Sequence, residues 1–382
     1  MAALNAKGLR RLRSVLQSHV DRGRIPGAIA AVALGGHVEC FETIGQLDAR
    51  AGTPMPADAI FRIYSMTKPL VSLAALMLAE EGRLQLTDEV AAFLPEFGSQ
   101  QVAVEEGAAT RLVPAGRPAT LHDLLRHTAG LTYEFLGDSA VQRQYRDARV
   151  ADRARSNADF CKVLATLPLA HHPGDCWEYS RATDVLGAVL EAATGQPLGA
   201  LLRERIFEPL GMKDTGFAVP RDQWHRIAQP LERDPDTGEA VTLLDARTVP
   251  AFESGGGGLM STADDYIRFL RLLRNQGQFE GTRLASRKTV EWMTADHLGA
   301  IPARHDLLPP GHGFGLGVAV RTAVGLAPQP GSVGQYFWSG IAGTYFLVDP
   351  AEDLFALLLL QAPNQRIHYR HLFRHLVYAA LD

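Results

Sequence analysis

Hydrophobic positions in the first part of the chain change from a helical period to a strand period and back. Residues 9–20 place four apolar side chains on one helical face, which predicts an amphipathic helix. Residues 28–34 and 37–43 are strand-like runs separated by two glycines, the composition of a tight hairpin turn. A further short strand is predicted at 60–63, and the apolar spacing after it predicts a long helix over 65–82.

The pattern changes at Thr87, after which strand-like runs give way to helical ones. Helices are predicted at 88–94, 120–127, 158–167, 182–193 and 201–210, separated by loops rich in glycine and proline. Beyond the four-glycine run 255–258, a helix capped by Ser261 or Thr262 is predicted to reach Leu273. Strand-like runs then return at 315–320, 333–338, 343–348 and 354–360, and a final helix is predicted from 368 to 381.

Strands at both ends of the chain, with helices between them, predict an α+β fold. We expect one antiparallel sheet flanked by helices, formed by a domain of residues 1–86 and 245–382. Residues 87–244 are expected to form an inserted helical domain. A ligand site is then predicted at the interface of the two domains, where pockets are common.

Composition narrows the class of protein. The chain has 382 residues, of which 46% are hydrophobic and 21% charged, as in ordinary globular proteins. The net charge of -4 gives no reason to expect a nucleic acid or an anionic membrane as partner. The three widely spaced cysteines suggest neither a disulfide framework nor a zinc site. Because residues 1–20 lack a signal-peptide pattern and no apolar run is long enough for a bilayer, we expect a cytoplasmic protein.

A serine and a lysine stand three residues apart at the start of the helix predicted over 65–82. Residues at this spacing share a helical face, so Lys68 could take a proton from Ser65 if burial lowered the pKa of its amine. The backbone N–H of Ser65, at a helix N-terminus, would favour an oxyanion. The spacing alone leaves open that Ser65 only caps the helix and Lys68 is solvated.

Two other segments carry candidate chemistry. Tyr179 precedes a predicted helix and could relay a proton between Ser65 and a leaving group, or could be an ordinary buried aromatic residue. Residues 336–346 contain small residues within a strand pattern. Such glycines indicate either a bulge or the close approach of a ligand, to which the strand edge could offer a second oxyanion N–H.

Taken together, these residues resemble the serine β-lactamase and penicillin-binding-protein superfamily. Residues 65–68 match its Ser-x-x-Lys motif, 179–181 stand at the Tyr-x-Asn position, and 338–340 at the Lys-Thr-Gly position. Segments 121–131 and 255–265 resemble its signature loops. The resemblance covers nearly the whole chain and is closest to the class C-like branch that includes the family VIII carboxylesterases.

The resemblance implies an acyl-enzyme mechanism that needs no metal or cofactor. Ser65 would attack a carbonyl, and Lys68 and Tyr179 would together handle its proton, with the choice of base left open. The N–H groups of Ser65 and Ile341 would form the oxyanion hole. The substrate-binding residues that the resemblance implies are Trp338, Ser339, Gly340, Arg181 and His127.

Two departures from the superfamily pattern bear on the substrate. Trp338 stands where β-lactamases have a lysine that holds a carboxylate, and offers an apolar wall suited to an uncharged ester. Arg181 replaces the usual asparagine and could itself supply a cation, which keeps some β-lactam turnover open. We therefore expect a serine carboxylesterase that acts on short acyl esters of small molecules. A β-lactamase, D-amino-acid peptidase or acyltransferase is the alternative, followed by a non-catalytic binding relative. The sequence makes no prediction of oligomeric state.

Overall fold

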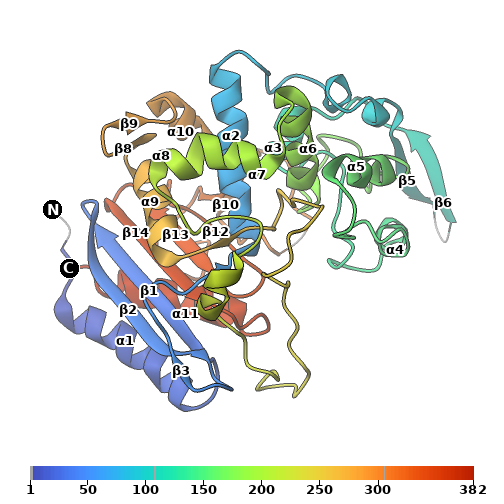
Figure 1. Ribbon diagram of the computed structural model, residues 1–382. Helices are drawn as coiled ribbons and strands as arrows, with labels where there is room; N and C mark the ends of the chain where they lie inside the picture. The colour runs from blue at the N-terminus through green and yellow to red at the C-terminus, as the bar shows by residue number, and fades with distance from the viewer. Residues whose placement is uncertain (1–2, 107–108, 305) are drawn as a thin grey trace.

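The computed structural model describes residues 3–106, 109–304 and 306–382 (Figure 1). Residues 1–2, 107–108 and 305 fall within the predicted domains but lie outside the described residues. The largest element is an antiparallel sheet of eight strands in the order β10-β11-β12-β13-β14-β1-β2-β3. Its strands are β1 (Gly27–Leu34), β2 (His37–Asp48), β3 (Thr53–Pro54), β10 (His312–Phe314), β11 (Ala319–Arg321), β12 (Tyr336–Ser339), β13 (Tyr345–Asp349) and β14 (Leu354–Leu360).

The two ends of the chain meet at the centre of this sheet. Strand β1 pairs with β14 from Ala28–Leu360 to Leu34–Leu354, and its other edge pairs with β2 through the predicted hairpin. Gly35 and Gly36 close the hairpin with φ angles of 60° and 83°, which glycine adopts without steric cost. The α+β class and the antiparallel sheet built from both chain ends are therefore confirmed.

Helices cover both faces of the sheet. They are α1 (Ala6–Asp21), α2 (Thr67–Glu80), α3 (Leu121–Leu125), α4 (Ala140–Asp147), α5 (Asn157–Ala165), α6 (Ala182–Thr194), α7 (Leu198–Leu202), α8 (Glu208–Leu210), α9 (Ala263–Arg274), α10 (Arg287–Met293) and α11 (Arg366–Tyr378). Successive side chains of a strand point to opposite faces of its sheet. On β13, Tyr345 contacts Phe373 of α11, whereas its neighbour Phe346 contacts Tyr266 of α9. Helices α9 and α11 therefore pack on opposite faces, and α1 packs beside α11.

Three short ladders lie outside the large sheet. They are β4 (Phe61–Arg62) with β7 (Met260–Ser261), β5 (Gln101–Glu106) with β6 (Ala109–Pro114), and β8 (Gln278–Phe279) with β9 (Thr282–Arg283). The β5–β6 hairpin corrects the expectation that the middle of the chain is entirely helical. Its strands contain only short apolar runs, at 102–104 and 112–113, which do not stand out among the predicted helices around them.

Two other predicted elements are also different in the structure. Residues 88–94 form a loop with a single 3-10 turn at Val90–Ala92 instead of a helix. Residues 315–318 connect β10 to β11 instead of forming a strand. The predicted helix at 201–210 is instead three helical stretches, in which the π-helical turn Arg203–Phe207 joins α7 to α8.

Helices α3 to α6 and the β5–β6 hairpin gather to one side of α2, away from the large sheet (Figure 1). Helix α6 connects the two parts of the fold, because it contacts both α2 and the helices α3 and α5. The boundaries predicted at residues 87 and 244 stay a prediction.

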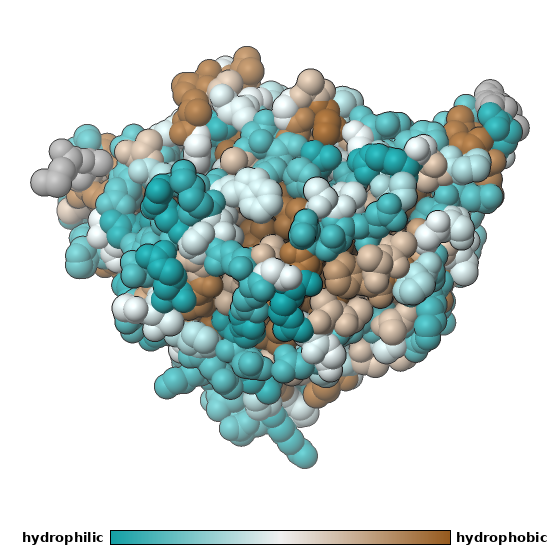
Figure 2. All heavy atoms as spheres, turned by 90° about the horizontal axis from the view of Figure 1, so that it is seen from above, coloured by the Kyte–Doolittle hydropathy of each residue, from teal (hydrophilic) through white to brown (hydrophobic). Residues whose placement is uncertain are grey.

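The surface mixes polar and apolar residues. On the face seen in Figure 2, hydrophilic residues surround small hydrophobic groups, some of which lie in a hollow near its centre. Among the described helices, none alone has the length and apolar composition of a membrane span. The segments Ala182–Thr194 and Leu198–Leu210 have the length and apolar composition of a membrane span only when they are taken together, and they are bent by 81° relative to each other.

Candidate active site

Ser65 lies on a tight turn between the β4–β7 ladder and helix α2. The 3-10 turn Tyr64–Met66 holds it, so that α2 begins at Thr67 and not at Ser65 as predicted. Tyr64 has a φ of 44°, a left-handed conformation that costs free energy in a residue other than glycine. Its phenol oxygen accepts a hydrogen bond of 2.8 Å from the N–H of Leu244, which anchors the turn. The turn thus fixes Ser65 at the head of α2.

Lys68 is completely buried one helical turn after Ser65. Its Nζ donates hydrogen bonds to Ser65 Oγ at 3.3 Å, to the hydroxyl of Tyr133 at 3.0 Å and to the carbonyl of Gly256 at 2.6 Å. Burial lowers the pKa of Lys68 to about 7; the Asp184 carboxylate opposes this shift and Arg181 adds to it. Near neutral pH a substantial share of Lys68 is therefore the free amine, which can accept the proton of a serine hydroxyl.

Tyr179 completes a cluster with this serine and lysine. Its hydroxyl is hydrogen-bonded to Ser65 and accepts the indole N–H of Trp338 at 3.2 Å. The Nζ of Lys68 lies 4.4 Å from the centre of the Tyr179 ring. Burial raises the pKa of Tyr179 above its ordinary value, although both hydrogen bonds oppose the shift, so the side chain is a phenol at neutral pH. The three residues predicted to act together are thus brought together.

Two residues predicted to contact substrate, Trp338 and His127, are buried and pack against Tyr179. Trp338 is 5% exposed, and its N–H is directed at the Tyr179 hydroxyl rather than forming an apolar wall. His127 is 1% exposed, and its ring centre lies 4.9 Å from that of Tyr179. The His127 Nδ1 accepts the backbone N–H of Ser180 at 3.3 Å, which fixes the ring. Both side chains therefore hold Tyr179 in place, and their direct contact with substrate stays a prediction.

Arg181 lines the candidate site, but carboxylates already neutralise it. Its guanidinium forms ion pairs with Glu134 and, at 3.3 Å, with Asp184, and it stacks on the Tyr133 ring at 4.7 Å. Burial alone would lower the pKa of Arg181, but these carboxylates outweigh that effect and raise it. The possibility that Arg181 offers a free cation to a substrate carboxylate is not supported by this pairing.

The end of β12 lies against the Ser65 turn. The N–H of Gly340 donates to the carbonyl of Thr344 at 2.8 Å, and the Thr344 hydroxyl donates to the carbonyl of Ile63 at 3.3 Å. A Cβ atom at Gly340 would collide with that same Ile63 carbonyl, so this position requires glycine. Ser339, just before it, pairs with Tyr345 at the end of the ladder. The predicted close approach at residues 336–346 is therefore between two stretches of backbone.

Ile341 follows this glycine and lines the same cavity as Ser65. Among the described residues, no hydrogen bond engages the backbone N–H of Ile341 or of Ser65. Two unengaged donors beside one serine are the arrangement that an oxyanion hole requires. The assignment of these N–H groups to an oxyanion hole stays a prediction, which the arrangement favours.

Three residues around Lys68 were missed in the sequence. Tyr133 accepts a hydrogen bond from the lysine, and Asp184 accepts the N–H of Gly256 at 2.9 Å. A Cβ atom at Gly256 would lie 2.8 Å from Asp184 Oδ2 and 2.9 Å from the Tyr133 hydroxyl, so this position favours glycine. The signals were present: Tyr133 follows the signature loop 121–131, and Gly256 belongs to the four-glycine run. Neither pattern says that the two segments meet at Lys68.

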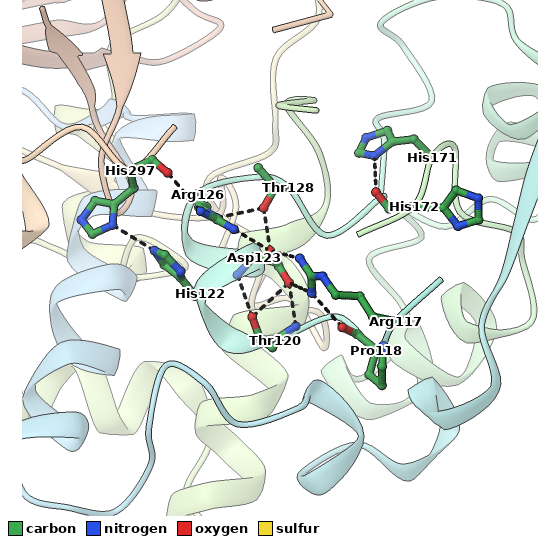
Figure 3. A network of polar contacts seen from close by, with 10 residues as sticks. All are labelled: Arg117, Pro118, Thr120, His122, Asp123, Arg126, Thr128, His171, His172 and His297. Carbon is green, nitrogen blue, oxygen red and sulfur yellow. Dashed lines mark hydrogen bonds and ion pairs between the residues drawn. The ribbon is translucent and has the colours of Figure 1, made fainter. Parts of the chain in front are cut away.

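A buried carboxylate holds together the residues from Arg117 to Thr128 (Figure 3). His127 lies within this stretch, and Tyr133 follows it in the sequence. Asp123 of α3 is fully buried and accepts two hydrogen bonds from Arg117, at 2.6 and 3.0 Å, one from Thr128 at 2.8 Å and one from Arg126 at 3.1 Å. These bonds, with the capping box at Thr120, overcome the cost of burial and hold the pKa of Asp123 well below its usual range. The cluster joins the residues on both sides of α3 into one rigid support.

A cavity of about 300 Å³ opens in front of Ser65. Its wall is aromatic and aliphatic with a few charged groups, formed by Tyr64, Ser65, Tyr133, Glu134, Phe135, Ala151, Arg153, Arg181, Leu244, Phe252, Ser254, Gly256, Gly257, Gly258 and Ile341. Phe135 and Ile341 are 54% and 38% exposed, which places them at its mouth. Within the described part of the chain, no group of three or more His, Cys, Asp or Glu side chains could hold a metal ion.

An antiparallel sheet flanked by helices, with a serine at a cavity that contacts a buried lysine and tyrosine, defines a serine hydrolase of the β-lactamase fold. The chain belongs to the β-lactamase family, since residues 12–378 match the family described as Beta-lactamase. This match extends over nearly the whole chain, as the resemblance of the motifs implied.

Individual relatives agree with this assignment. Protein Rv1367c of Mycobacterium tuberculosis is 38% identical over 353 residues, 89% of this chain and 87% of its own. Esterase EstB of Burkholderia gladioli is 35% identical over 372 residues, 91% of this chain and 89% of its own. Among solved structures, EstCE1, described as a hydrolase with promiscuous acyltransferase activity, has a TM-score of 0.82 and 29% identity, covering 97% of this chain and 99% of its own. The protein is thus an enzyme of the serine hydrolase superfamily with esterase relatives.

Proposed function

We propose that this protein is a carboxylesterase that cleaves short-chain acyl esters of small molecules through an acyl-enzyme on Ser65. One observation carries the proposal: Ser65 Oγ is 3.3 Å from the Nζ of a completely buried lysine whose pKa is lowered to about 7. Such a lysine is a base strong enough to activate a serine and is available in its neutral form near pH 7.

Acylation begins when Ser65 Oγ attacks the ester carbonyl and Lys68 takes the hydroxyl proton. The N–H groups of Ser65 and Ile341 stabilise the oxyanion of the tetrahedral intermediate. The bond to the alcohol oxygen then breaks, and the departing alkoxide takes the phenol proton of Tyr179. The phenolate that remains is stabilised by the Lys68 ammonium and by the N–H of Trp338, which already contacts its oxygen.

Deacylation uses the same groups in reverse. The Tyr179 phenolate takes a proton from water, which attacks the acyl carbon. When the second tetrahedral intermediate collapses, the bond to Ser65 Oγ breaks and Lys68 returns the proton to the serine. The free acid leaves, and all three side chains regain their starting protonation states. The raised pKa of Tyr179 favours Lys68 as the acylation base, because it keeps Tyr179 a phenol at neutral pH.

At the two positions where the sequence departs from the β-lactamase pattern, neither residue offers a free cation, which favours an ester over a β-lactam. Where the superfamily has a lysine, Trp338 supplies a neutral donor to Tyr179, and Arg181 is paired with Glu134 and Asp184. The names of EstB and EstCE1 point the same way. Faster turnover of nitrocefin than of simple esters would favour a β-lactamase instead.

The proposal is tested with 4-nitrophenyl acetate and butyrate. We expect wild-type protein to hydrolyse both, Ser65→Ala to lose activity, and Lys68→Ala and Tyr179→Phe each to lower kcat by about 10³-fold. Because the three side chains act as a unit, the double variant should be little worse than either single one. Ser14→Ala, an exposed serine on α1, is the matched control. Hydrolysis that survives in Ser65→Ala would overturn the proposal.

A second candidate is acyl transfer to an alcohol, which the description of EstCE1 favours. The acyl-enzyme would be the same, and an alcohol would replace water as the second nucleophile. Adding a primary alcohol to the ester assay distinguishes the two: ester product in excess of free acid would mark a transferase.

A further inference from the structure

We propose that the natural substrate carries a carboxylate, and that Arg153 binds it at the wall of the Ser65 cavity. The inference rests on the proposed esterase function and adds a substrate class to it. It follows from the charged residues that line the cavity, of which Arg153 alone forms no ion pair within the described part of the chain.

Arg153 forms no ion pair with a carboxylate of the described residues, although the negative charge of Asp245 acts on it from farther away. It lines the same cavity as Ser65 and is about half buried. Its one side-chain hydrogen bond is long, 3.5 Å from Nη1 to the carbonyl of Asp245, and no carboxylate of the described residues forms an ion pair with it. The Asp245 carboxylate is already held by the Arg247 N–H at 3.1 Å and the Thr248 hydroxyl at 2.7 Å. Partial burial lowers the pKa of Arg153, and the negative charge of Asp245 opposes this shift.

The other charged groups on the cavity wall are paired. Glu134 and Arg181 neutralise each other, and Asp184 supplies Arg181 with a second carboxylate. The lysine that contacts Ser65 is buried behind the wall. An anion entering the cavity would therefore meet Arg153 as its free partner. A guanidinium prefers planar oxyanions, above all carboxylates, which it can bind through two parallel hydrogen bonds.

The other residues that line the cavity indicate the chemistry of the rest of the substrate. Tyr64, Phe135, Leu244, Phe252 and Ile341 offer aromatic and aliphatic surface between Ser65 and the cavity mouth. In about 300 Å³ such a wall suits a short apolar chain. The ligand class is thus an ester with an apolar segment and a carboxylate, on either its acyl or its alcohol half.

Matched ester pairs test this inference. In the first pair, 4-nitrophenyl hydrogen glutarate carries the charge on the acyl half, and its methyl ester is the neutral equivalent. In the second pair, 3-butyryloxybenzoate carries the charge on the alcohol half, and its methyl ester is again the control. We expect the wild type to prefer the anionic member of at least one pair by about tenfold in kcat/KM, chiefly through KM. The preference should weaken with salt.

Variants assign the preference to Arg153. Arg153→Gln should reduce the ratio of anionic to neutral kcat/KM to about one, and Arg153→Lys should keep part of it because the charge remains. Arg149→Gln removes the same charge from an exposed position in the same loop and should keep the wild-type ratio. Equal loss on both members of a pair would give Arg153 a structural role and overturn the inference, as would a wild type without preference in either pair.

Failure of this inference is distinguishable from failure of the proposed function. A fluorophosphonate labels an activated serine whatever the charge of the natural substrate. Labelling at Ser65 and hydrolysis of neutral esters without an anionic preference would remove the inference and leave the esterase. Absence of both would remove the proposed function itself.

Discussion

At the scale of single residues, the pH dependence of the reaction depends on the acceptors around Lys68. Tyr133, Ser65 and Gly256 all accept hydrogen bonds from its Nζ, and each stabilises the protonated amine against the cost of burial. Since only the free amine accepts the serine proton, kcat/KM should rise with pH through about 7 and then level off.

Tyr133→Phe should shift this acidic limb to lower pH by about one unit. It removes one acceptor of the ammonium, so the pKa of Lys68 falls further, while the ring stays in place. The measurement is kcat/KM for 4-nitrophenyl butyrate from pH 5 to 9. Tyr145→Phe, at another buried tyrosine that does not contact Lys68, is the control. A limb that does not move in Tyr133→Phe would contradict the assignment of Lys68 as the titrating base.

Trp338 gives a second prediction at this scale. Trp338→Phe removes the N–H that contacts the Tyr179 hydroxyl but keeps an aromatic ring in the same place. Because this N–H stabilises the phenolate that forms during acylation, we expect kcat to fall about tenfold with little change in KM. Trp292→Phe, an exposed indole outside the cavity, should behave as wild type. An increase in KM without a change in kcat would contradict this role and support the substrate-binding role predicted for Trp338 from the sequence.

At the scale of elements, the Asp123 cluster keeps α3 and its flanking loops together (Figure 3). Asp123→Asn should lower the free energy of unfolding at pH 7 by about 2 kcal/mol. This is less than a fully buried ion pair would cost, because the Arg117 side chain is 42% exposed. The pKa of Asp123 is depressed in the folded state, so its stabilisation is complete above the unfolded value of 3.8 and is lost as the pH falls below it.

Urea denaturation at pH 7 and pH 3 checks this effect. The gap between wild type and Asp123→Asn should be wide at pH 7 and narrower at pH 3. Asp159→Asn, in an exposed pair with Lys162, removes a carboxylate from a nearby helix and should change stability by less than about 0.5 kcal/mol. Equal effects of the two substitutions would mean that the cluster is not a support.

At the scale of the whole molecule, all three cysteines are free thiols that are buried in the folded protein. Cys40, Cys161 and Cys176 are buried, and burial raises the pKa of Cys40 and Cys176 to about 11. Ellman's reagent should therefore react with no thiol of the native protein within minutes and with three after denaturation in guanidinium chloride. If three thiols react in the denatured protein when no reductant has been added, the protein contains no disulfide. Rapid reaction of the native protein would contradict the burial.

The overall fold could be predicted from the sequence because it depends on the period of the hydrophobic positions. Strands at 28–34 and 354–360 and the helix after Ser65 follow directly from it, and so does the sheet made from both chain ends. The β5–β6 hairpin was not predicted because its apolar runs are short and lie in a mainly helical region. Motif spacing identified Ser65, Lys68 and Tyr179, but it could not give the direction in which a side chain points. For that reason the contacts of Trp338 and His127 with Tyr179 could not be predicted from the sequence.

The place of β1 in the sheet has a consequence for protein synthesis. Leu34 at the end of β1 pairs with Leu354, which leaves the ribosome 320 residues later (354 − 34 = 320). At 5–20 residues per second, this interval is roughly 20–60 s. For all of it one edge of β1, a strand whose side chains are almost all buried in the finished protein, has no partner in the nascent chain. An unpaired apolar strand edge is a template for aggregation, so the yield of folded enzyme should depend on chaperones that cover the first eighth of the chain until the last strand is made.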